Sequence, residues 1–206
     1  MSTHAERPVR FQTDDGVSIV GDLAVPATCR AAAVVCHPHP QYGGNRFNPV
    51  VDALYRTLPS VGVAALRFDF RADFDDGIGE RLDAAAALTE LALLVPAVPQ
   101  LVCGYSFGAM IALGLDQPDL AAKVLIAPPL GHIAAEPGTA VPTLVLTPAH
   151  DQFAPPEVAR PIVEGWADAD FGVIEMADHF IAGQTGSVAD TAASWVSDRL
   201  PPRSPL

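Results

Sequence analysis

The stretch 101-LVCGYSFGAM-110 decides the fold, and Ser106 lies at its centre. The apolar run 101–103 is typical of a buried strand, and 109-AMIAL-113 continues with the spacing of a helix face. Between them, 104-GYSFG-108 predicts a sharp turn from strand to helix with the serine at its apex. A serine in that position needs neighbours that tolerate strain, and we expect Gly104 and Gly108 to supply them.

Strands alternate with helices on both sides of this turn. We expect strands at 31–36, 63–70, 100–105, 123–127, 143–147 and 171–176, and helices at 47–60, 80–95, 107–116, 156–166 and 186–199. A hairpin over 9–25, turning at Asp14-Asp15-Gly16, precedes them. The sequence therefore predicts one α/β domain over residues 1–206. Its mostly parallel sheet has an antiparallel N-terminal hairpin and helices on both faces, and its ends are frayed at 1–8 and 201–206.

Composition excludes several classes of function. The chain has 206 residues, half of them hydrophobic, and a net charge of −12 that would repel nucleic acid and anionic membrane surfaces. Residues 1–11 have no apolar segment typical of a secretory signal, and no window approaches the ~18 apolar residues of a membrane-spanning helix. Three cysteines without a CxxC pair suit a reducing compartment. We therefore expect a cytoplasmic protein with no nucleic-acid and no membrane partner, and make no prediction for its oligomeric state.

Four loops at the expected carboxyl ends of strands carry polar residues, at His37, Ser106, Asp151 and His179. In a parallel sheet these ends meet at one edge, where sites form. A serine hydroxyl is protonated at neutral pH, so it needs a histidine to take its proton and an acid to orient that histidine. The chain order Ser106, Asp151, His179 is the order expected when the serine follows a strand-to-helix elbow. These three residues are our predicted catalytic triad.

Other residues are less well placed for the two supporting roles. The alternatives are His4, His132 and His150 as the base, and Glu175 and Asp178 as the acid. His4 lies near the terminus, His132 lies in a loop rich in proline and glycine, and His150 is adjacent to the predicted acid. Glu175 lies within an expected strand, and Asp178 is adjacent to the predicted base.

Five motifs occur in order over residues 31–180. They are 37-HPHPQYGG-44, 67-RFDFR-71, 79-GERLD-83, 104-GYSFGA-109 and 178-DHF-180. With these motifs the chain resembles the α/β-hydrolase superfamily, and within it the compact, lidless bacterial hydrolases that are dienelactone-hydrolase-like or esterase-like. The resemblance implies that Ser106 is the nucleophile, Asp151 the acid and His179 the base.

Acyl-transfer chemistry also needs donors for the oxyanion. We expect the backbone N–H of Phe107, the residue after the nucleophile, to be one donor. The second should come from the loop after His37, where Pro38 and Pro40 have no N–H to give. His39 fits best by its position, with Tyr42 as the alternative.

The pocket is expected to be open. About fifteen residues separate the strand ending at Ala127 from the next one, which leaves no room for a substantial lid. We predict that Tyr42 and Phe153 line the pocket and bind substrate. The acidic loop 72-ADFDD-76 departs from the glycine and serine usual in such relatives, and we expect it to border the pocket.

Several conspicuous residues have simpler structural interpretations. His37 and His39 lack a third ligand with suitable spacing, so we expect His37 to brace its own loop and predict no metal site. Arg67 and Arg71 are expected to pair with nearby acids such as Asp69 or Glu80. Cys103 is expected to be a small buried hydrophobic residue.

The sequence thus predicts a serine hydrolase that cleaves a small carboxylic ester or thioester without a metal or organic cofactor. Two alternatives stay open. The same triad could perform acyl transfer, carbon–carbon bond hydrolysis or perhydrolysis, or the fold could serve as an inactive interaction protein.

Overall fold

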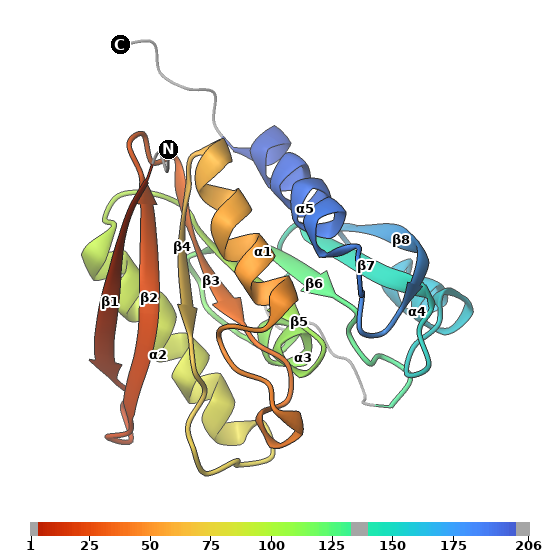
Figure 1. Cartoon of the computed structure of the whole chain (residues 1–206), viewed down its shortest axis with the longest axis horizontal. Coiled ribbons are helices and arrows are strands. Elements are labelled where there is room, and N and C mark those ends of the chain that lie inside the picture. Colours follow the sequence, from red (N-terminus) through yellow and green to blue (C-terminus); the bar gives the residue numbers. More distant parts are fainter. Residues whose placement is uncertain (1–3, 133–139, 201–206) are drawn as a thin grey trace.

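An eight-stranded sheet forms the centre of the molecule, seen in a computed structural model that describes residues 4–132 and 140–200 (Figure 1). The strand order is β1-β2-β4-β3-β5-β6-β7-β8. The strands are β1 (His4–Gln12), β2 (Ser18–Pro26), β3 (Ala31–Cys36), β4 (Val63–Phe68), β5 (Gln100–Tyr105), β6 (Leu120–Ile126), β7 (Thr143–His150) and β8 (Ala169–Asp178). From β4 to β8 in this order every neighbouring pair is parallel, whereas β1 with β2 and β2 with β4 are antiparallel.

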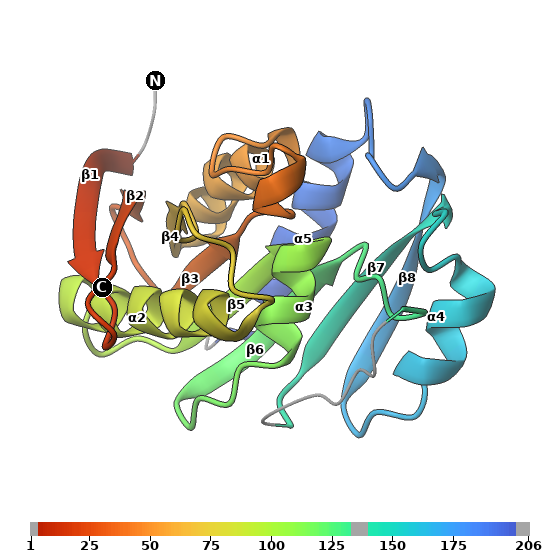
Figure 2. The ribbon, with the colours of Figure 1, turned by 90° about the horizontal axis from the view of Figure 1, so that it is seen from below.

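Helices cover both faces of the sheet. Helices α1 (Pro49–Thr57) and α5 (Thr185–Arg199) lie on one face, and α2 (Ile78–Leu94), α3 (Phe107–Leu113) and α4 (Pro156–Val163) lie on the other (Figure 2). Two short 3-10 helices, η1 (Pro40–Tyr42) and η2 (Leu58–Val61), flank α1. This arrangement confirms the predicted α/β architecture.

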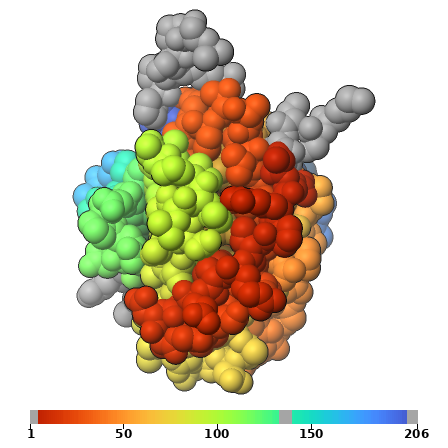
Figure 3. Space-filling model, turned by 90° about the vertical axis from the view of Figure 1, so that its left-hand side faces the viewer, coloured from red at the N-terminus to blue at the C-terminus, as the bar shows by residue number. Residues whose placement is uncertain are grey.

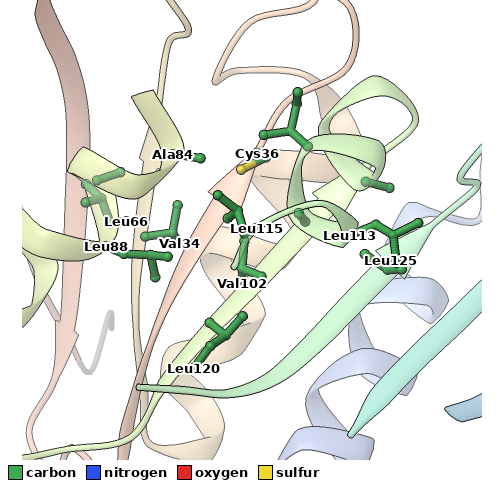
Figure 4. Packing of buried hydrophobic residues seen from close by; sticks show 14 of the residues in the cluster. Val34, Cys36, Leu66, Ala84, Leu88, Val102, Leu113, Leu115, Leu120 and Leu125 are labelled. Carbon is green, nitrogen blue, oxygen red and sulfur yellow. The ribbon is translucent and has the colours of Figure 1, made fainter. Parts of the chain in front are cut away.

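The core consists of two apolar layers, one on each face of the sheet. Side chains alternate along a strand, so Val34 and Cys36 of β3 join the layer beneath α2 and α3, while Ala33 and Val35 join the layer beneath α1 and α5. Figure 4 shows the first layer, in which Val34 and Val102 from adjacent strands lie near leucines of the helices and loops. A strand that is buried on both faces has a continuous run of apolar residues in its sequence, which explains the pattern at 31–36 and 101–103.

The N-terminal hairpin corrects one expectation. Residues 1–8 were expected to be frayed, but β1 begins at His4 and pairs with β2 from His4 opposite Pro26 to Gln12 opposite Ser18. Residues 4–8 are therefore part of the sheet, because β2 offers them a full set of backbone partners. The hairpin lies beside α2 on the same side of the molecule (Figure 3). Residues 1–3 and 201–206 lie outside the described residues.

The parallel strands end at a common edge. Cys36 of β3 is aligned with Gly104 of β5, Tyr105 of β5 with Ile126 of β6, and Ile126 with Leu146 of β7. The loops that follow β3, β5, β6, β7 and β8 consequently open at the same end of the sheet, which brings the four predicted site loops together.

The connection from β6 to β7 spans residues 127–142, and its middle, 133–139, lies outside the described residues. Its described parts, 127–132 and 140–142, contain no helix. Within residues 4–132 and 140–200, no helix combines the length and hydropathy that crossing a bilayer requires.

Candidate active site

Ser106 forms the apex of the turn between β5 and α3. Its backbone has φ 54° and ψ −116°, a conformation that is strained for a residue with a side chain. The Ser106 N–H donates to the carbonyl of Ile126 at 2.9 Å. The Ser106 carbonyl accepts from the N–H groups of Ala109 and Met110, at 3.0 and 3.2 Å. These bonds hold the serine in its strained conformation, with its side chain directed out of the strand.

The flanking glycines have a different role from the one we expected. Neither Gly104 nor Gly108 has a positive φ, so they do not carry the strain themselves. Instead, a Cβ on Gly104 would lie 2.2 Å from the Gly108 carbonyl oxygen, and a Cβ on Gly108 would lie 2.4 Å from the carbonyl oxygen of Cys36. Glycine is required because β3, β5 and α3 approach so closely that no side chain fits between them.

The structure brings the three predicted triad side chains into one hydrogen-bonded chain. Ser106 Oγ lies 2.9 Å from His179 Nε2, and His179 Nδ1 lies 2.8 Å from Asp151 Oδ2. Asp151 Oδ1 accepts the N–H groups of Phe153 and Ala154, at 2.8 and 3.1 Å. A carboxylate at Nδ1 keeps the proton on that nitrogen and leaves the lone pair of Nε2 facing the serine.

Asp151 is buried, with 3% of its surface exposed. Burial alone would raise its pKa, but the hydrogen bonds from His179 and from two backbone N–H groups outweigh this and lower the pKa below its ordinary value. The carboxyl is therefore ionised wherever the histidine would act as a base.

The alternative residues lie elsewhere. Asp178 Oδ1 accepts the N–H of Phe180, and the side chains of Glu175 and His150 are exposed. The His132 ring contacts Phe153, with ring centroids 6.1 Å apart. The His4 side chain lies outside the described part of the structure. None of these groups makes a hydrogen bond to Ser106 or His179 among the described residues.

Tyr105 is a site residue that the sequence analysis missed. Its hydroxyl donates to the backbone carbonyl of His179 at 2.7 Å, and its ring stacks on the His179 ring with centroids 5.8 Å apart. Burial raises the pKa of Tyr105, so the phenol stays protonated and remains a donor. Tyr105 thereby ties the histidine loop to the strand that ends at the serine. The only available signal was a hydroxylated aromatic residue directly before the nucleophile.

Replacing Tyr105 with phenylalanine tests this positioning role. The substitution keeps the stacked ring and removes one hydrogen bond, so we expect kcat to fall about five- to tenfold, with KM nearly unchanged. Steady-state kinetics and the rate of covalent labelling of Ser106 should fall together. A lower melting temperature with unchanged kcat would contradict the positioning role and leave only a structural one.

The predicted oxyanion donors differ in availability. Phe107 is the first residue of α3, and N–H groups in the first turn of a helix have no acceptor within that helix. In the loop after β3, the N–H of Tyr42 donates to the His39 carbonyl at 3.1 Å and is already engaged. The His39 N–H has no hydrogen-bond partner among residues 4–132 and 140–200. The geometry therefore favours His39 over Tyr42.

A cavity of about 550 Å³ opens beside Ser106. Its walls come from the loops after β3, β5, β6, β7 and β8 and from α3, and the lining residues are Pro38, His39, Tyr42, Gly43, Gly44, Asn48, Tyr105, Ser106, Phe107, Met110, Pro129, Phe153, His179 and Phe180. Tyr42 and Phe153 both line it, and their role in substrate binding stays a prediction. Apart from the two histidines and two tyrosines, none of these residues has an ionisable side chain.

The acidic loop does not border the cavity as expected. Asp73, Asp75 and Asp76 are not among the lining residues described above. The loop reaches the site through Phe74, whose ring packs against His39 and Phe107 with centroids 4.5 and 5.7 Å apart. The aromatic ring supports two residues of the cavity wall, and the carboxylates are directed elsewhere.

His37 braces its own loop, as expected. Its Nδ1 lies 2.6 Å from the Pro38 carbonyl oxygen, and its Nε2 accepts the N–H of Phe70 at 3.0 Å. Burial lowers the pKa of His37, which is consistent with a neutral ring that donates through one nitrogen and accepts through the other. Among the described residues, no group of three histidine, cysteine, aspartate or glutamate side chains is arranged to hold a metal ion.

The arginines pair with acids, but the expected partners were wrong. Arg67 pairs with Asp22 and Asp52, and Arg71 pairs with Asp83 and Asp15. Asp69 pairs with Arg46, and Glu80 accepts the N–H groups of Asp75 and Gly77. Proximity in the sequence did not predict the ion-pair partners, because the strands and helices bring acids from more distant positions closer to the two arginines.

Cys103 is fully buried in β5, and burial raises its pKa to about 12. It is a packing residue with a protonated thiol, as expected.

Comparisons with known proteins agree with this architecture. No family model matches the chain. Uncharacterized protein RP471 of Rickettsia prowazekii is 33% identical over 173 residues, covering 74% of this chain and 73% of that protein. An α/β serine hydrolase homologue from Coxiella burnetii superposes with a TM-score of 0.84 at 25% identity, over 92% of this chain and 97% of that one. A lidless α/β serine hydrolase from Xanthomonas campestris has a TM-score of 0.86 at 24% identity, over 97% of both chains.

The strand-to-helix elbow, the parallel sheet and these similarities define the class of protein. The chain belongs to the α/β-hydrolase superfamily and is an enzyme of the hydrolase class. It belongs to the same family as RP471. The resemblance drawn from the five sequence motifs is thereby confirmed at the level of the superfamily.

Proposed function

We propose that the protein is a serine hydrolase that cleaves a small carboxylic ester or thioester through an acyl-enzyme intermediate. The observation that carries this proposal is the continuous chain of hydrogen bonds from Ser106 through His179 to Asp151 in the wall of an open cavity. A serine hydroxyl becomes a useful nucleophile only with such a base and orienting acid.

In the first half of the reaction, Ser106 Oγ attacks the carbonyl carbon while its proton passes to His179 Nε2. The N–H groups of Phe107 and His39 stabilise the oxyanion of the tetrahedral intermediate, an effect worth about 3–4 kcal/mol per donor in other acyl-transfer enzymes. Asp151 stabilises the imidazolium that forms. The intermediate collapses when His179 gives the proton to the leaving oxygen or sulfur, which leaves an acyl group on Ser106.

The second half reverses these roles with water as the nucleophile. His179 takes a proton from the water as it attacks the acyl carbon, and then returns that proton to Ser106 Oγ. The cavity suits small substrates, because its volume is about 550 Å³ and its walls include the aromatic side chains of Tyr42 and Phe153.

The test uses a fluorophosphonate probe, which reports an activated serine without presupposing a substrate. We expect mass spectrometry to find the probe on Ser106 of the purified protein, and the labelling rate to collapse in His179→Ala. His150→Ala is the matched control, since this exposed histidine makes no contact with Ser106 and should leave labelling intact. A folded protein that resists the probe would contradict the proposal and favour an inactive interaction protein.

A further inference from the structure

Two phenylalanine rings stand exposed beside His179. The Phe153 ring contacts the His179 ring edge-to-face with centroids 4.5 Å apart, and the Phe180 centroid lies 6.0 Å from it. The two side chains are 43% and 66% exposed, and both line the cavity. Large aromatic side chains gathered in the open around one polar group mark a binding surface more often than isolated exposed ones do.

Hydrogen bonds fix the backbone at both phenylalanines. Phe153 N–H donates to the buried Asp151 carboxylate, and Phe180 N–H donates to Asp178 at 3.0 Å. They come from different loops, after β7 and β8 respectively, and meet only at His179. The fold therefore presents a fixed pair of apolar surfaces to whatever lies against Nε2 of that histidine.

The chemistry of the proposed reaction decides which part of an ester lies there. His179 Nε2 must protonate the leaving oxygen, so the alcohol portion has to lie on the histidine side of the tetrahedral carbon. The oxyanion is directed to the N–H groups of Phe107 and His39. The acyl portion is left with the remaining lining residues, which include Tyr42 and Met110.

The charge of the site restricts this alcohol portion further. The described lining residues include no lysine or arginine, so an anionic group on the alcohol would find no positively charged partner there. The chain as a whole carries a net charge of −12, which also disfavours anionic substrates.

We propose that Phe153 and Phe180 form the binding site for the alcohol portion of the ester, and that this portion is apolar and carries no negative charge. This inference rests on the proposed serine hydrolase function and adds its leaving-group specificity. Aromatic contacts of this kind contribute about a two- to tenfold preference each.

The experiment compares acetate esters that share one acyl group. Ethyl, benzyl and 4-carboxybenzyl acetate have alcohols of similar acidity but differ in apolar area and charge. We expect wild-type kcat/KM to be highest for benzyl acetate, and about tenfold lower or more for its carboxylated analogue. In Phe153→Ala and Phe180→Ala, the ratio of kcat/KM for benzyl over ethyl acetate should fall about three- to tenfold.

Two controls distinguish loss of contacts to the alcohol from a displacement of His179 by the phenylalanine substitutions. Phe47→Ala removes an exposed phenylalanine that does not line the cavity and should keep the wild-type ratio. With 4-nitrophenyl acetate, burst kinetics separate acylation from deacylation. Because the alcohol has left before deacylation, the phenylalanine substitutions should slow acylation more than deacylation.

Three results would overturn the proposal. These are an unchanged benzyl-to-ethyl ratio, an equal loss in acylation and deacylation, or a preference for the carboxylated ester. Fluorophosphonate labelling of Ser106 in the same variants distinguishes this failure from failure of the proposed function. Labelled variants with an unchanged ratio would contradict only the leaving-group site, whereas an unlabelled wild-type protein would contradict both.

Discussion

Replacing Asp151 with asparagine is expected to lower kcat for ester hydrolysis by about 10⁴-fold, although the two side chains have nearly the same shape. Asp151 Oδ1 accepts two backbone N–H groups, from Phe153 and Ala154. In the variant only the amide oxygen can accept those bonds, so the amide NH₂ must face His179 Nδ1. That nitrogen then has to act as an acceptor, and the ring proton moves to Nε2. A histidine protonated at Nε2 is unable to take the proton of Ser106.

The measurement is kcat with a reactive aryl ester, together with the rate of fluorophosphonate labelling, and both should fall by similar factors. Glu175→Gln provides a matched control, because Glu175 is an exposed acid on β8 that makes no contact with the triad. Activity of Asp151→Asn within tenfold of wild type would show that another acid orients the histidine.

The pH dependence of the same site follows from Asp151. Its pKa in the folded protein lies below its ordinary value, so ionised Asp151 contributes stability that is fully present above the ordinary pKa of an aspartate. This contribution is lost only as the pH falls through the lowered folded-state pKa. The difference in unfolding free energy between wild type and Asp151→Asn should therefore narrow only in acid, and urea unfolding followed by circular dichroism at several pH values checks this.

The order of the elements, and the three residues that the structure joins by hydrogen bonds at the site, could be predicted from the sequence, because each depends on local pattern. The apolar runs of β3 and β5 mark strands buried on both faces. The positions of Ser106, Asp151 and His179 after strands place them at one edge of a parallel sheet. Predicting these three residues did not require knowing which residues pair across the sheet.

The features that were missed all depend on pairings distant in the chain. Asp22 partners Arg67 because the two lie directly opposite each other in the antiparallel ladder of β2 and β4, and that register is not encoded in either strand alone. Tyr105 reaches the carbonyl of a residue 74 positions away. The space requirement at Gly108 comes from the approach of β3, which no local pattern reveals.

Arg71 and Asp83 form a deeply buried ion pair between the loop after β4 and helix α2. Asp83 is fully buried on α2, and it accepts the Arg71 backbone N–H at 2.9 Å and the guanidinium Nη2 at 2.8 Å. Burial raises the pKa of Asp83 even though the bonds from Arg71 act to lower it, so the cost of desolvation is not fully offset. The pair fixes the start of the loop that carries Phe74 to the wall of the active site.

Asp83→Ala is therefore expected to lower the free energy of unfolding by about 3–5 kcal/mol, because it leaves the buried Arg71 N–H without its acceptor and removes the fully buried one of the two carboxylates that neutralise the guanidinium, with the partly exposed Asp15 as the other. Urea unfolding followed by circular dichroism measures the loss. Asp170→Ala is the matched control, since Asp170 pairs with Arg199 on the surface, and it should cost no more than about 1 kcal/mol.

A second comparison separates the charge from the packing. If the cost arises from a guanidinium that Asp15 alone only partly compensates, Arg71→Met combined with Asp83→Ala should be more stable than Asp83→Ala alone, because the buried charge is then gone. Losses of stability that simply add would instead mean that Asp83 acts through packing.

In either variant, displacement of the 71–77 loop would also remove Phe74 from His39, so a reduced labelling rate at Ser106 should accompany the loss of stability. A destabilised protein with wild-type labelling would contradict this link between the buried pair and the active site.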